Sequence, residues 1–281
     1  MRLTIIGGDL RQAYAAERLI KMGHTVTVCS VTAPPIGALV AEDVRDAVGS
    51  ADAVALPIPA TESGGGIRGS AGLLPSTVLS LMAPGTLLLG GNLSAALVSS
   101  ARERGVRTVD YLCRESFVLQ NAYLTAQAAL GILLRELPVC LYRTRVAILG
   151  FGRIGKFLAR MLHALGAEVT VFARSSSDLA MASLIGMETK TVAALQNNAA
   201  LDFAEAIVNT APARLLRSEH LANLRDGALI LELASGSDNL PQPPPEHAPK
   251  ILCAQGLPGK CFPKSAGEIV AKATDEALSL L

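Results

Sequence analysis

The chain has 281 residues, of which 50% are hydrophobic and 17% are charged, with a formal net charge of +1. This length predicts about two domains. The near-neutral charge gives no sign of a basic face that would bind nucleic acid or an acidic membrane surface. We expect no apolar run long enough to span a bilayer. The five cysteines form no CxxC pair and no metal-ligand spacing. They predict small core residues of a cytoplasmic protein without a metal.

The N-terminal part predicts a strand–helix–strand unit, beginning with a strand at Leu3–Ile6 and without a secretory leader. A turn at Gly23 leads to the second strand, Val26–Val28. Between them, Asp9 and Gln12 stand where a dinucleotide-binding turn has glycines. A carboxylate there opposes an anion, and a Gln side chain obstructs close helix packing. We therefore expect no dinucleotide in this first copy.

A helix is expected over residues 121–136, because its sequence has helical character and Pro138 ends it. This helix is predicted to link a first domain, residues 1–120, to a second domain, residues 121–281.

A glycine-rich turn after the apolar strand Val146–Leu149 carries the strongest functional signal. In this turn Gly150 permits a tight bend, Gly152 lets the backbone approach a pyrophosphate, and Gly155 lets the next helix pack close to the strand. The phosphates would face the unpaired N–H groups of the helix N-terminus. The alternative is an ordinary turn of an α/β fold. We predict a dinucleotide site whose contacts here are Gly150, Gly152, Arg153, Ile154 and Gly155.

The end of the following strand predicts which dinucleotide binds. An NAD site usually presents Asp or Glu there to hold the ribose 2′-hydroxyl. This chain has Ala173-Arg174-Ser175-Ser176, and a guanidinium with two hydroxyls can bind a 2′-phosphate that a carboxylate would repel. We therefore predict NADP, contacted by these four residues. The alternative is that Arg174 is a solvated loop cation.

Two later strand ends are further candidates for cofactor contacts, the alternative being ordinary strand-to-loop turns. Their residues are Thr210, Ala211 and Pro212 after one strand, and Ala234 and Ser235 after the next.

The two halves of the chain follow one plan. Gly7 lies 143 positions before Gly150, and the same offset places Gly23 on Gly166. The strands after these glycines also coincide. Two consecutive Rossmann-like α/β domains with parallel sheets are therefore predicted, the second with an intact glycine motif.

The C-terminal segment predicts a helix over residues 266–281. Ser265 and Glu268 have the spacing of a capping box, in which the hydroxyl and the carboxylate satisfy free N–H groups of the first turn.

Several strings resemble the family of the dipicolinate synthase A subunit over nearly the whole chain. The N-terminal Gly7-Gly-Asp9-Leu-Arg11-Gln12 is similar to the family's Gly-Gly-Asp-x-Arg-Gln opening. The glycine-motif domain also resembles the family's cofactor domain. Gly256-Leu-Pro-Gly259 and Pro263-Lys-Ser-Ala-Gly267 resemble its C-terminal signature.

The resemblance implies NADP-dependent oxidation of a dihydro or hydroxy-tetrahydro precursor to dipicolinate, the pyridine dicarboxylate of bacterial endospores. It also implies a partner, the B subunit of dipicolinate synthase, and a role in sporulation. We further expect a homo-oligomer. One departure concerns the segment where the family has Pro, Glu and Gly, because this chain has Leu124, Gln127 and Ala128. Gln127 can hydrogen-bond but cannot accept a proton as a glutamate would.

A dicarboxylate substrate calls for cations. Arg11 follows the first strand at the sheet edge where α/β folds bind ligands, and Lys264 precedes the terminal helix. Both could instead be surface cations. Asp9 could orient Arg11 or cap the first helix.

Two other functions stay open. One is a 2-hydroxyacid or amino-acid dehydrogenase, which would need a His–carboxylate pair that no motif supplies. The other is a non-catalytic NADP-binding regulatory subunit, which Gln127 favours.

Overall fold

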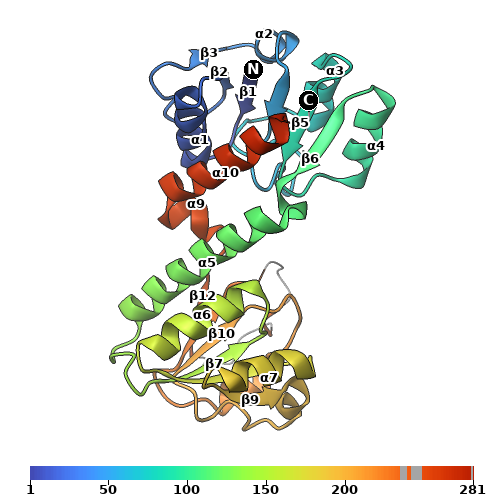
Figure 1. The fold of residues 1–281 in the computed structure, drawn as a ribbon. Helices are drawn as coiled ribbons and strands as arrows, with labels where there is room; N and C mark the ends of the chain where they lie inside the picture. Colours follow the sequence, from blue (N-terminus) through green and yellow to red (C-terminus); the bar gives the residue numbers. More distant parts are fainter. Residues whose placement is uncertain (235–238, 242–248, 280) are drawn as a thin grey trace. The chain divides into compact units, whose positions relative to one another are not determined.

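The computed structural model describes residues 1–234, 239–241, 249–279 and 281 (Figure 1). The chain forms two compact units. The first consists of Met1–Asn121 together with Pro258–Leu281, and the second of Ala122–Leu257.

The first unit is built on a six-stranded parallel sheet with the order β3-β2-β1-β4-β5-β6. The strands are β1 (Arg2–Ile6), β2 (Thr25–Cys29), β3 (Leu39–Val40), β4 (Ala53–Ala55), β5 (Leu87–Gly90) and β6 (Arg107–Asp110). The helices are α1 (Leu10–Lys21), α2 (Val44–Gly49), α3 (Pro75–Leu81), α4 (Ala95–Glu103), the short 3-10 helix η1 (Tyr111–Cys113), α9 (Leu257–Cys261) and α10 (Pro263–Leu278).

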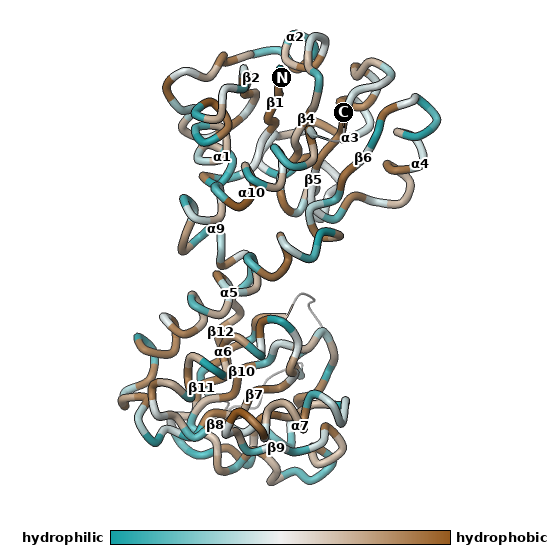
Figure 2. The backbone as a smooth tube through the Cα atoms, in the orientation of Figure 1, coloured by the Kyte–Doolittle hydropathy of each residue, from teal (hydrophilic) through white to brown (hydrophobic). Residues whose placement is uncertain are grey.

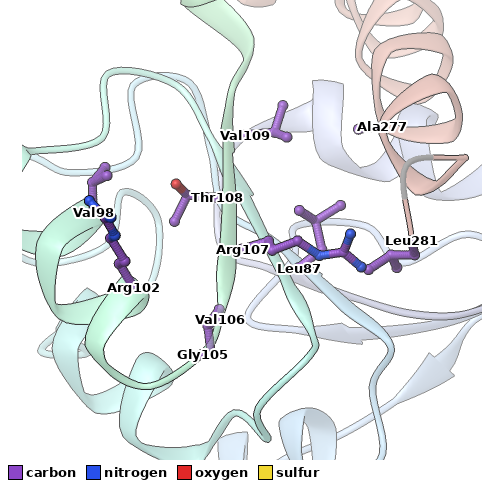
Figure 3. A pocket seen from close by; sticks show the side chains of 10 residues that line it. All are labelled: Leu87, Val98, Arg102, Gly105, Val106, Arg107, Thr108, Val109, Ala277 and Leu281. Carbon is purple, nitrogen blue, oxygen red and sulfur yellow. The ribbon is translucent and has the colours of Figure 1, made fainter.

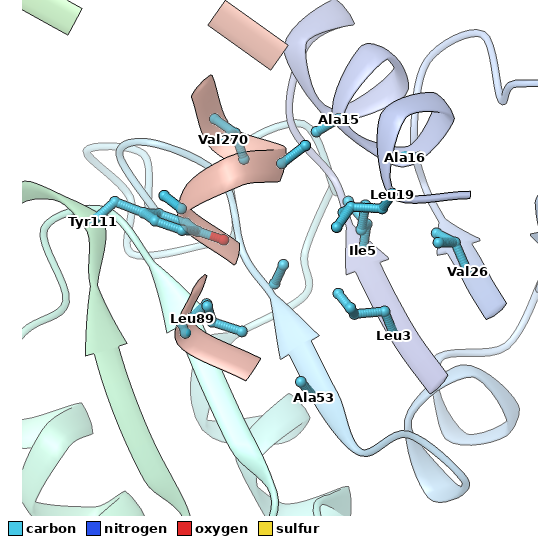
Figure 4. Packing of buried hydrophobic residues seen from close by; sticks show 14 of the residues in the cluster. Leu3, Ile5, Ala15, Ala16, Leu19, Val26, Ala53, Leu89, Tyr111 and Val270 are labelled. Carbon is cyan, nitrogen blue, oxygen red and sulfur yellow. The ribbon is translucent and has the colours of Figure 1, made fainter. Parts of the chain in front are cut away.

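Apolar side chains cover both faces of this sheet, as a parallel sheet requires. On one face, Leu3 and Ile5 of β1 pack against α1 and α10 (Figure 4). On the other face, Ile6 and Val54 pack against α2, α3 and α4. The hydrophobic colouring of the chain follows the central strands of both units (Figure 2).

The terminal helix α10 belongs to the first unit, which corrects the predicted second domain of residues 121–281. Long-range side-chain contacts hold it there: the Tyr111 hydroxyl hydrogen-bonds to Thr274 Oγ1 at 2.7 Å, and Arg114 pairs with Glu276 at 3.0 Å. The partners are 163 and 162 positions apart in the sequence, so no local pattern could indicate them.

The start of α10 also differs from the prediction. The helix begins at Pro263, its N-cap is Phe262, and no side chain caps it. Ser265 therefore lies inside the first turn and does not form the expected capping box with Glu268. The proline, which suits the first turn because its missing N–H would be unpaired there anyway, sets the start.

The helix α5 spans Glu115–Glu136 and thus begins six residues before the predicted linker helix. Phe117 packs in the core of the first unit, and Tyr123 makes an edge-to-face contact with Phe157 in the second. In the described part of the chain, this helix alone is long and apolar enough to cross a membrane by length and composition, and 44% of that stretch is buried. The expectation that no run reaches this length was wrong, although core helices pass the same test.

The second unit contains a parallel sheet with the order β12-β11-β10-β7-β8-β9. Its strands are β7 (Arg145–Leu149), β8 (Glu168–Ala173), β9 (Glu188–Thr191), β10 (Ala206–Asn209), β11 (Leu229–Glu232) and β12 (Lys250–Cys253). Its helices are α6 (Arg153–Ala164), α7 (Ser176–Leu184), η2 (Val192–Gln196) and α8 (Ser218–Ala222).

The predicted internal repeat is confirmed. Adding the offset of 143 positions to β1 and α1 gives the bounds of β7 and α6. In each sheet the repeat's first strand lies between its second and fourth, so both units have the strand order of a doubly wound dinucleotide-binding fold. The two sheets are therefore copies of one architecture.

The cysteines correct a smaller expectation. All five are free thiols, but only Cys29 is buried, while Cys113, Cys140, Cys253 and Cys261 are exposed.

Candidate functional site: the glycine turn of the second unit

The turn between β7 and α6 has the shape that a bound pyrophosphate requires. Gly150 adopts φ +98°, and a Cβ there would lie 2.8 Å from Thr210 Oγ1. A Cβ on Gly155 would overlap the Gly150 carbonyl oxygen, so only glycine lets α6 pack this close to β7. Gly152 differs, because no heavy atom of the described residues lies within 4 Å of the Cβ position considered there. This position is therefore open to a ligand.

The N-terminus of α6 is ready to receive an anion. Gly152 is the N-cap of this 12-residue helix, and no side chain caps it. The first N–H groups of a helix lack intrahelical partners and carry the positive end of the helix dipole. The residues present therefore fit a dinucleotide phosphate. Arg153 is exposed beside Gly152, and Ile154 is half-buried.

The turn after β8 presents the residues that predict NADP. Ala173 is buried at the strand end, whereas Arg174, Ser175 and Ser176 are exposed. Ser175 is the N-cap of α7, and its Oγ accepts from the Asp178 N–H at 3.4 Å. Arg174 forms no ion pair with the described residues, so its guanidinium can approach a ligand.

A cation next to this turn was not predicted. Lys156, in the second turn of α6, pairs with Asp178 of α7 at 2.8 Å. Its ammonium also lies 5.6 Å from the centre of the Phe151 ring. This ion pair joins the N-terminal part of α6 to that of α7.

The carboxyl ends of β10 and β11 meet beside the glycine turn. Strand register aligns Asn209 of β10 with Leu149 of β7 on one side and Glu232 of β11 on the other. Thr210 follows at once, and its Oγ1 donates to the carbonyl oxygens of Leu149 and Gly150 at 3.1 and 3.2 Å. Ala211 is half-buried, Pro212 is exposed and Ala234 is buried. The predicted contact Ser235 lies outside the described residues.

Asn209 and Glu232 form a buried polar pair that sequence reasoning missed. Their side chains are 0% and 2% exposed, and the Asn209 amide donates to Glu232 Oε2 at 2.7 Å. Burial raises the pKa of the Glu232 carboxyl above its ordinary value, although hydrogen bonds from Asn209, from the Ala234 N–H and from the Asn239 side chain oppose the shift. The available signal was a glutamate inside the apolar string Leu-Ile-Leu-Glu-Leu.

The corresponding turn of the first unit is closed. Gln12 Oε1 accepts from the Asp9 N–H at 3.0 Å, and the Gln12 side chain fills the space where a Cβ on Gly8 would stand. The Gly8 N–H donates to the Arg68 carbonyl at 2.7 Å. The segment around Arg68 therefore lies on the turn that in the second unit faces open space. This arrangement supports the prediction that the first copy holds no dinucleotide.

Arg11 is a buried cation rather than a surface one. Its side chain is 6% exposed and forms a bidentate pair with Asp9, in which Nε and Nη2 each lie 2.9 Å from a carboxylate oxygen. Nη2 also donates to the Ile58 carbonyl at 2.8 Å. Asp9 at the same time caps α1 by accepting from the Arg11 N–H, so both roles considered for Asp9 are present. Burial raises the pKa of Asp9, but the Arg11 hydrogen bonds and charge outweigh it and leave the pKa below its ordinary value.

The N-terminal string Gly7–Gln12 and the C-terminal string Gly256–Gly259, which resemble those of the family, meet at this ion pair. A Cβ on Gly259 of α9 would lie 2.5 Å from Arg11 Nε and 2.8 Å from an Asp9 carboxylate oxygen. Gly259, the last glycine of the string Gly-Leu-Pro-Gly, therefore lets α9 lie directly on Asp9 and Arg11.

Lys264 and Gln127 lie elsewhere. Lys264 is exposed in the first turn of α10, where it borders a shallow pocket with Glu17 and Lys21 of α1. Gln127 is exposed on the part of α5 that belongs to the second unit.

The described histidines do not lie at the carboxyl edge of the second sheet. His163 borders a pocket at the start of β8, and His220 is buried against the Leu195 carbonyl. His24 pairs with Asp275 in the first unit, and His247 lies outside the described residues. No His–carboxylate pair of the 2-hydroxyacid dehydrogenase kind is formed by the described residues at this edge.

A separate pocket of about 450 Å³ runs along the outer strand β6 of the first unit (Figure 3). Val98 and Arg102 of α4 line one side, and Leu281 lines the other. Its lining is mostly aliphatic, and no described carboxylate, histidine or cysteine is part of it. It lacks the groups for catalysis and is not the candidate site.

Comparisons with known proteins first define the class. Residues 132–238 match the family model of the D-isomer specific 2-hydroxyacid dehydrogenase, NAD binding domain. The second unit is therefore a dehydrogenase-type domain for a nicotinamide dinucleotide. The fold of the whole chain is also that of L-alanine dehydrogenase, with a TM-score of 0.63 and 18% identity over 98% of this chain and 89% of that one.

The particular resemblance is to the A subunit of dipicolinate synthase. Residues 2–112 match the family model of the N-terminal domain of this A subunit. The A subunit from Bacillus subtilis (strain 168) is 26% identical over 99% of this chain and 96% of its own length. The crystal structure of the Bacillus halodurans protein has a TM-score of 0.87 at 26% identity, covering 99% of this chain and 97% of that one. The resemblance stated from the sequence is thereby confirmed.

Proposed function

We propose that this protein is an NADP-dependent oxidoreductase that oxidises dihydrodipicolinate, or its hydroxy-tetrahydro precursor, to dipicolinate. The observation that carries this proposal is the similarity to the dipicolinate synthase A subunit over 99% of the chain, with an open glycine turn in its dehydrogenase-type unit.

In this proposal the N-terminus of α6 and the backbone at Gly152 hold the pyrophosphate. Arg174 binds the 2′-phosphate, together with the hydroxyls of Ser175 and Ser176, because the turn after β8 offers a cation and hydroxyls without a carboxylate at the strand end. Thr210, Ala211, Pro212 and Ala234 line the other half of the dinucleotide, since they follow β10 and β11.

NADP supplies a hydride acceptor to this site. The substrate ring loses one hydride and one proton, so dihydrodipicolinate and NADP+ give dipicolinate, NADPH and a proton; the hydroxy-tetrahydro precursor first loses one water to give dihydrodipicolinate. Gain of an aromatic ring drives the step. The protein therefore has mainly to position the donor and to neutralise its two carboxylates.

Arg11 remains the leading candidate for a substrate carboxylate. Its Nε and Nη2 are held by Asp9 and Ile58, whereas Nη1 makes no hydrogen bond to the described residues. A fixed guanidinium that keeps one nitrogen for a ligand loses little conformational freedom on binding. Lys264 is the second candidate cation, and Gln127 is proposed to hydrogen-bond the substrate without taking its proton.

The test is an assay of the purified chain with NADP and enzymatically generated dihydrodipicolinate, with and without the B subunit of dipicolinate synthase. We expect NADPH formation at 340 nm and dipicolinate as the product. Dependence on the B subunit would support the proposed partner, and sedimentation would report the proposed homo-oligomer. Tight NADP binding without turnover under either condition would favour the regulatory role, the alternative that Gln127 suggests.

A further inference from the structure

Glu232 and Asn209 occupy an unusual position for buried polar side chains. They end two neighbouring strands at the carboxyl edge of the second sheet, and each extends one further hydrogen bond into the turn that follows its own strand. The Ala211 N–H donates to Asn209 Oδ1 at 3.2 Å, and the Ala234 N–H donates to Glu232 Oε1 at 2.8 Å. The amide-to-carboxylate bond of 2.7 Å then joins the two turns.

Burying these two polar side chains lowers the free energy of unfolding. No ion pair to Glu232 is found in the described part of the chain, and a carboxylate taken out of water without a cation is destabilising. An apolar pair at these positions would pack the strands without that cost. The pair does provide directional bonds, which fix the backbone of both turns more tightly than apolar contacts would.

The two turns lie on one side of the glycine turn. In a doubly wound fold the strand after the glycine helix, here β8, receives the adenosine half of the dinucleotide. The strands on the opposite side of β7, here β10 and β11, receive the nicotinamide half. The Asn209–Glu232 bond therefore braces the surface against which the reacting ring would lie.

We propose that Asn209 and Glu232 are a positioning pair that holds the backbone at Ala211, after β10, and at Ala234, after β11, in the conformation that binds the nicotinamide half of the cofactor. The inference rests on the proposed function, because it requires a dinucleotide in the second unit. The pair touches neither the hydride donor nor the acceptor in this proposal; it acts through the backbone at Ala211 and Ala234.

The polarity of the pair can be reversed without removing a hydrogen bond. In Glu232→Gln alone, the NH2 group of the new side chain takes the place of one of the two carboxylate oxygens. In one orientation it faces the donating amide of Asn209, and in the other it faces the Ala234 N–H, so one hydrogen bond is lost either way. In Asn209→Asp alone, two carboxylates face each other. In the double variant, the amide introduced at position 232 donates to the carboxylate introduced at position 209, while each side chain still accepts from its own turn. The three bonds that join the pair to each other and to the two turns are then restored, while the Asn239 side chain, which also interacts with Glu232, faces an amide in place of the carboxylate.

The experiment measures the dissociation constants of NADPH and of 2′,5′-ADP, which contains only the phosphorylated adenosine half, by calorimetry for each full-length variant. Each single variant should bind NADPH at least tenfold more weakly and 2′,5′-ADP within twofold of the wild type. The double variant should regain NADPH binding to within threefold. Glu205→Gln is the matched control, because Glu205 accepts from the Arg145 N–H at the opposite end of β10 and should leave both affinities unchanged.

Several outcomes overturn the inference. Unchanged NADPH binding in the single variants would do so. Equally weakened binding of NADPH and 2′,5′-ADP would also do so, because it indicates a general loss of structure. If a single variant does not fold, the double variant decides, and a double variant that fails to fold or to bind also overturns it. A wild-type chain that binds neither ligand instead contradicts the proposed function.

Discussion

A methyl group placed on Gly152 tests the cofactor site with little disturbance of the protein itself. The Cβ of Gly152→Ala would meet no heavy atom of the described residues within 4 Å, and the backbone does not need a positive φ there. We expect unfolding stability to change by less than about 1 kcal/mol, because alanine is a much poorer N-cap than glycine but also restricts the unfolded chain, and the two effects oppose each other. A bound pyrophosphate would meet the methyl group directly and lose a hydrogen bond to a charged group. Such a bond contributes about 1.5–3 kcal/mol, so the NADP dissociation constant should rise roughly 10- to 150-fold.

The neighbouring glycines provide the contrast. In Gly155→Ala the Cβ would overlap the Gly150 carbonyl oxygen and lie 3.2 Å from its carbonyl carbon, so α6 must move away from β7. Overpacking of this kind costs about 1–3 kcal/mol, and both stability and binding should fall. Gly131→Ala is the control, because Gly131 is exposed inside α5 with open space around it. It should stabilise the protein by about 0.5–1 kcal/mol and leave NADP binding unchanged.

Urea unfolding and calorimetric titration of the three variants give the two quantities separately. Wild-type affinity in Gly152→Ala would mean that no phosphate approaches this turn, and the cofactor assignment would be withdrawn. A large loss of stability in the same variant would contradict the open space above Gly152.

Four further predictions concern the cofactor, the substrate and pH. NADP should bind at least tenfold more tightly than NAD, which corresponds to about 1.4 kcal/mol, and Arg174→Ala should remove most of that difference in calorimetric titrations. Titration should give one NADP per chain, and Gly152→Asp should abolish binding; a stoichiometry of two would refute the closed first copy. Arg11→Ala should cost about 2–5 kcal/mol in catalytic efficiency with nearly unchanged NADP affinity, and Arg11→Lys should restore it only partly; wild-type kinetics would leave Lys264 as the candidate. Because the pKa of Glu232 is raised in the folded state, the folded protein binds its proton more tightly than the unfolded chain does. The protonated Glu232 side chain should therefore stabilise the fold below the unfolded pKa of about 4.5, and this stabilisation should be lost as the pH rises through the folded pKa. Glu232→Gln does not titrate, so over that pH range the free energy of unfolding of the wild type, measured with urea, should fall relative to that of the variant.

The features predicted from the sequence are those that local chemistry determines. The glycines at turns and the apolar strands fix the start of each copy, so the bounds of β7 and α6 follow from β1 and α1 by a constant offset. The end of α5 before Pro138 belongs to the same category. Each depends on residues within a few positions of one another.

The features that escaped prediction depend on distant partners. Nothing near α10 indicates that Tyr111 and Arg114 will hold it on the first unit. In the sequence, Glu232 only interrupts an apolar strand, and its partner Asn209 becomes visible through the register of β10 and β11. Arg11 is equally a possible surface cation in the sequence, and its burial becomes visible only when α9 lies on it through Gly259.

The two copies show how a few side chains decide whether a helix N-terminus can serve a ligand. In α1 the Asp9 carboxylate and the Gln12 amide form a capping box, so N–H groups at the helix start are satisfied within the protein. Such caps stabilise a helix by about 0.5–2 kcal/mol. In α6 the positions of Asp9 and Gln12 are Gly152 and Gly155, no described side chain caps the helix, and no described heavy atom lies within 4 Å of a Cβ on Gly152. The second copy therefore forgoes a stabilising interaction that the first copy has. Because two otherwise equivalent turns differ at these positions, the lack of a cap is best explained by a phosphate that takes the place of the missing carboxylate.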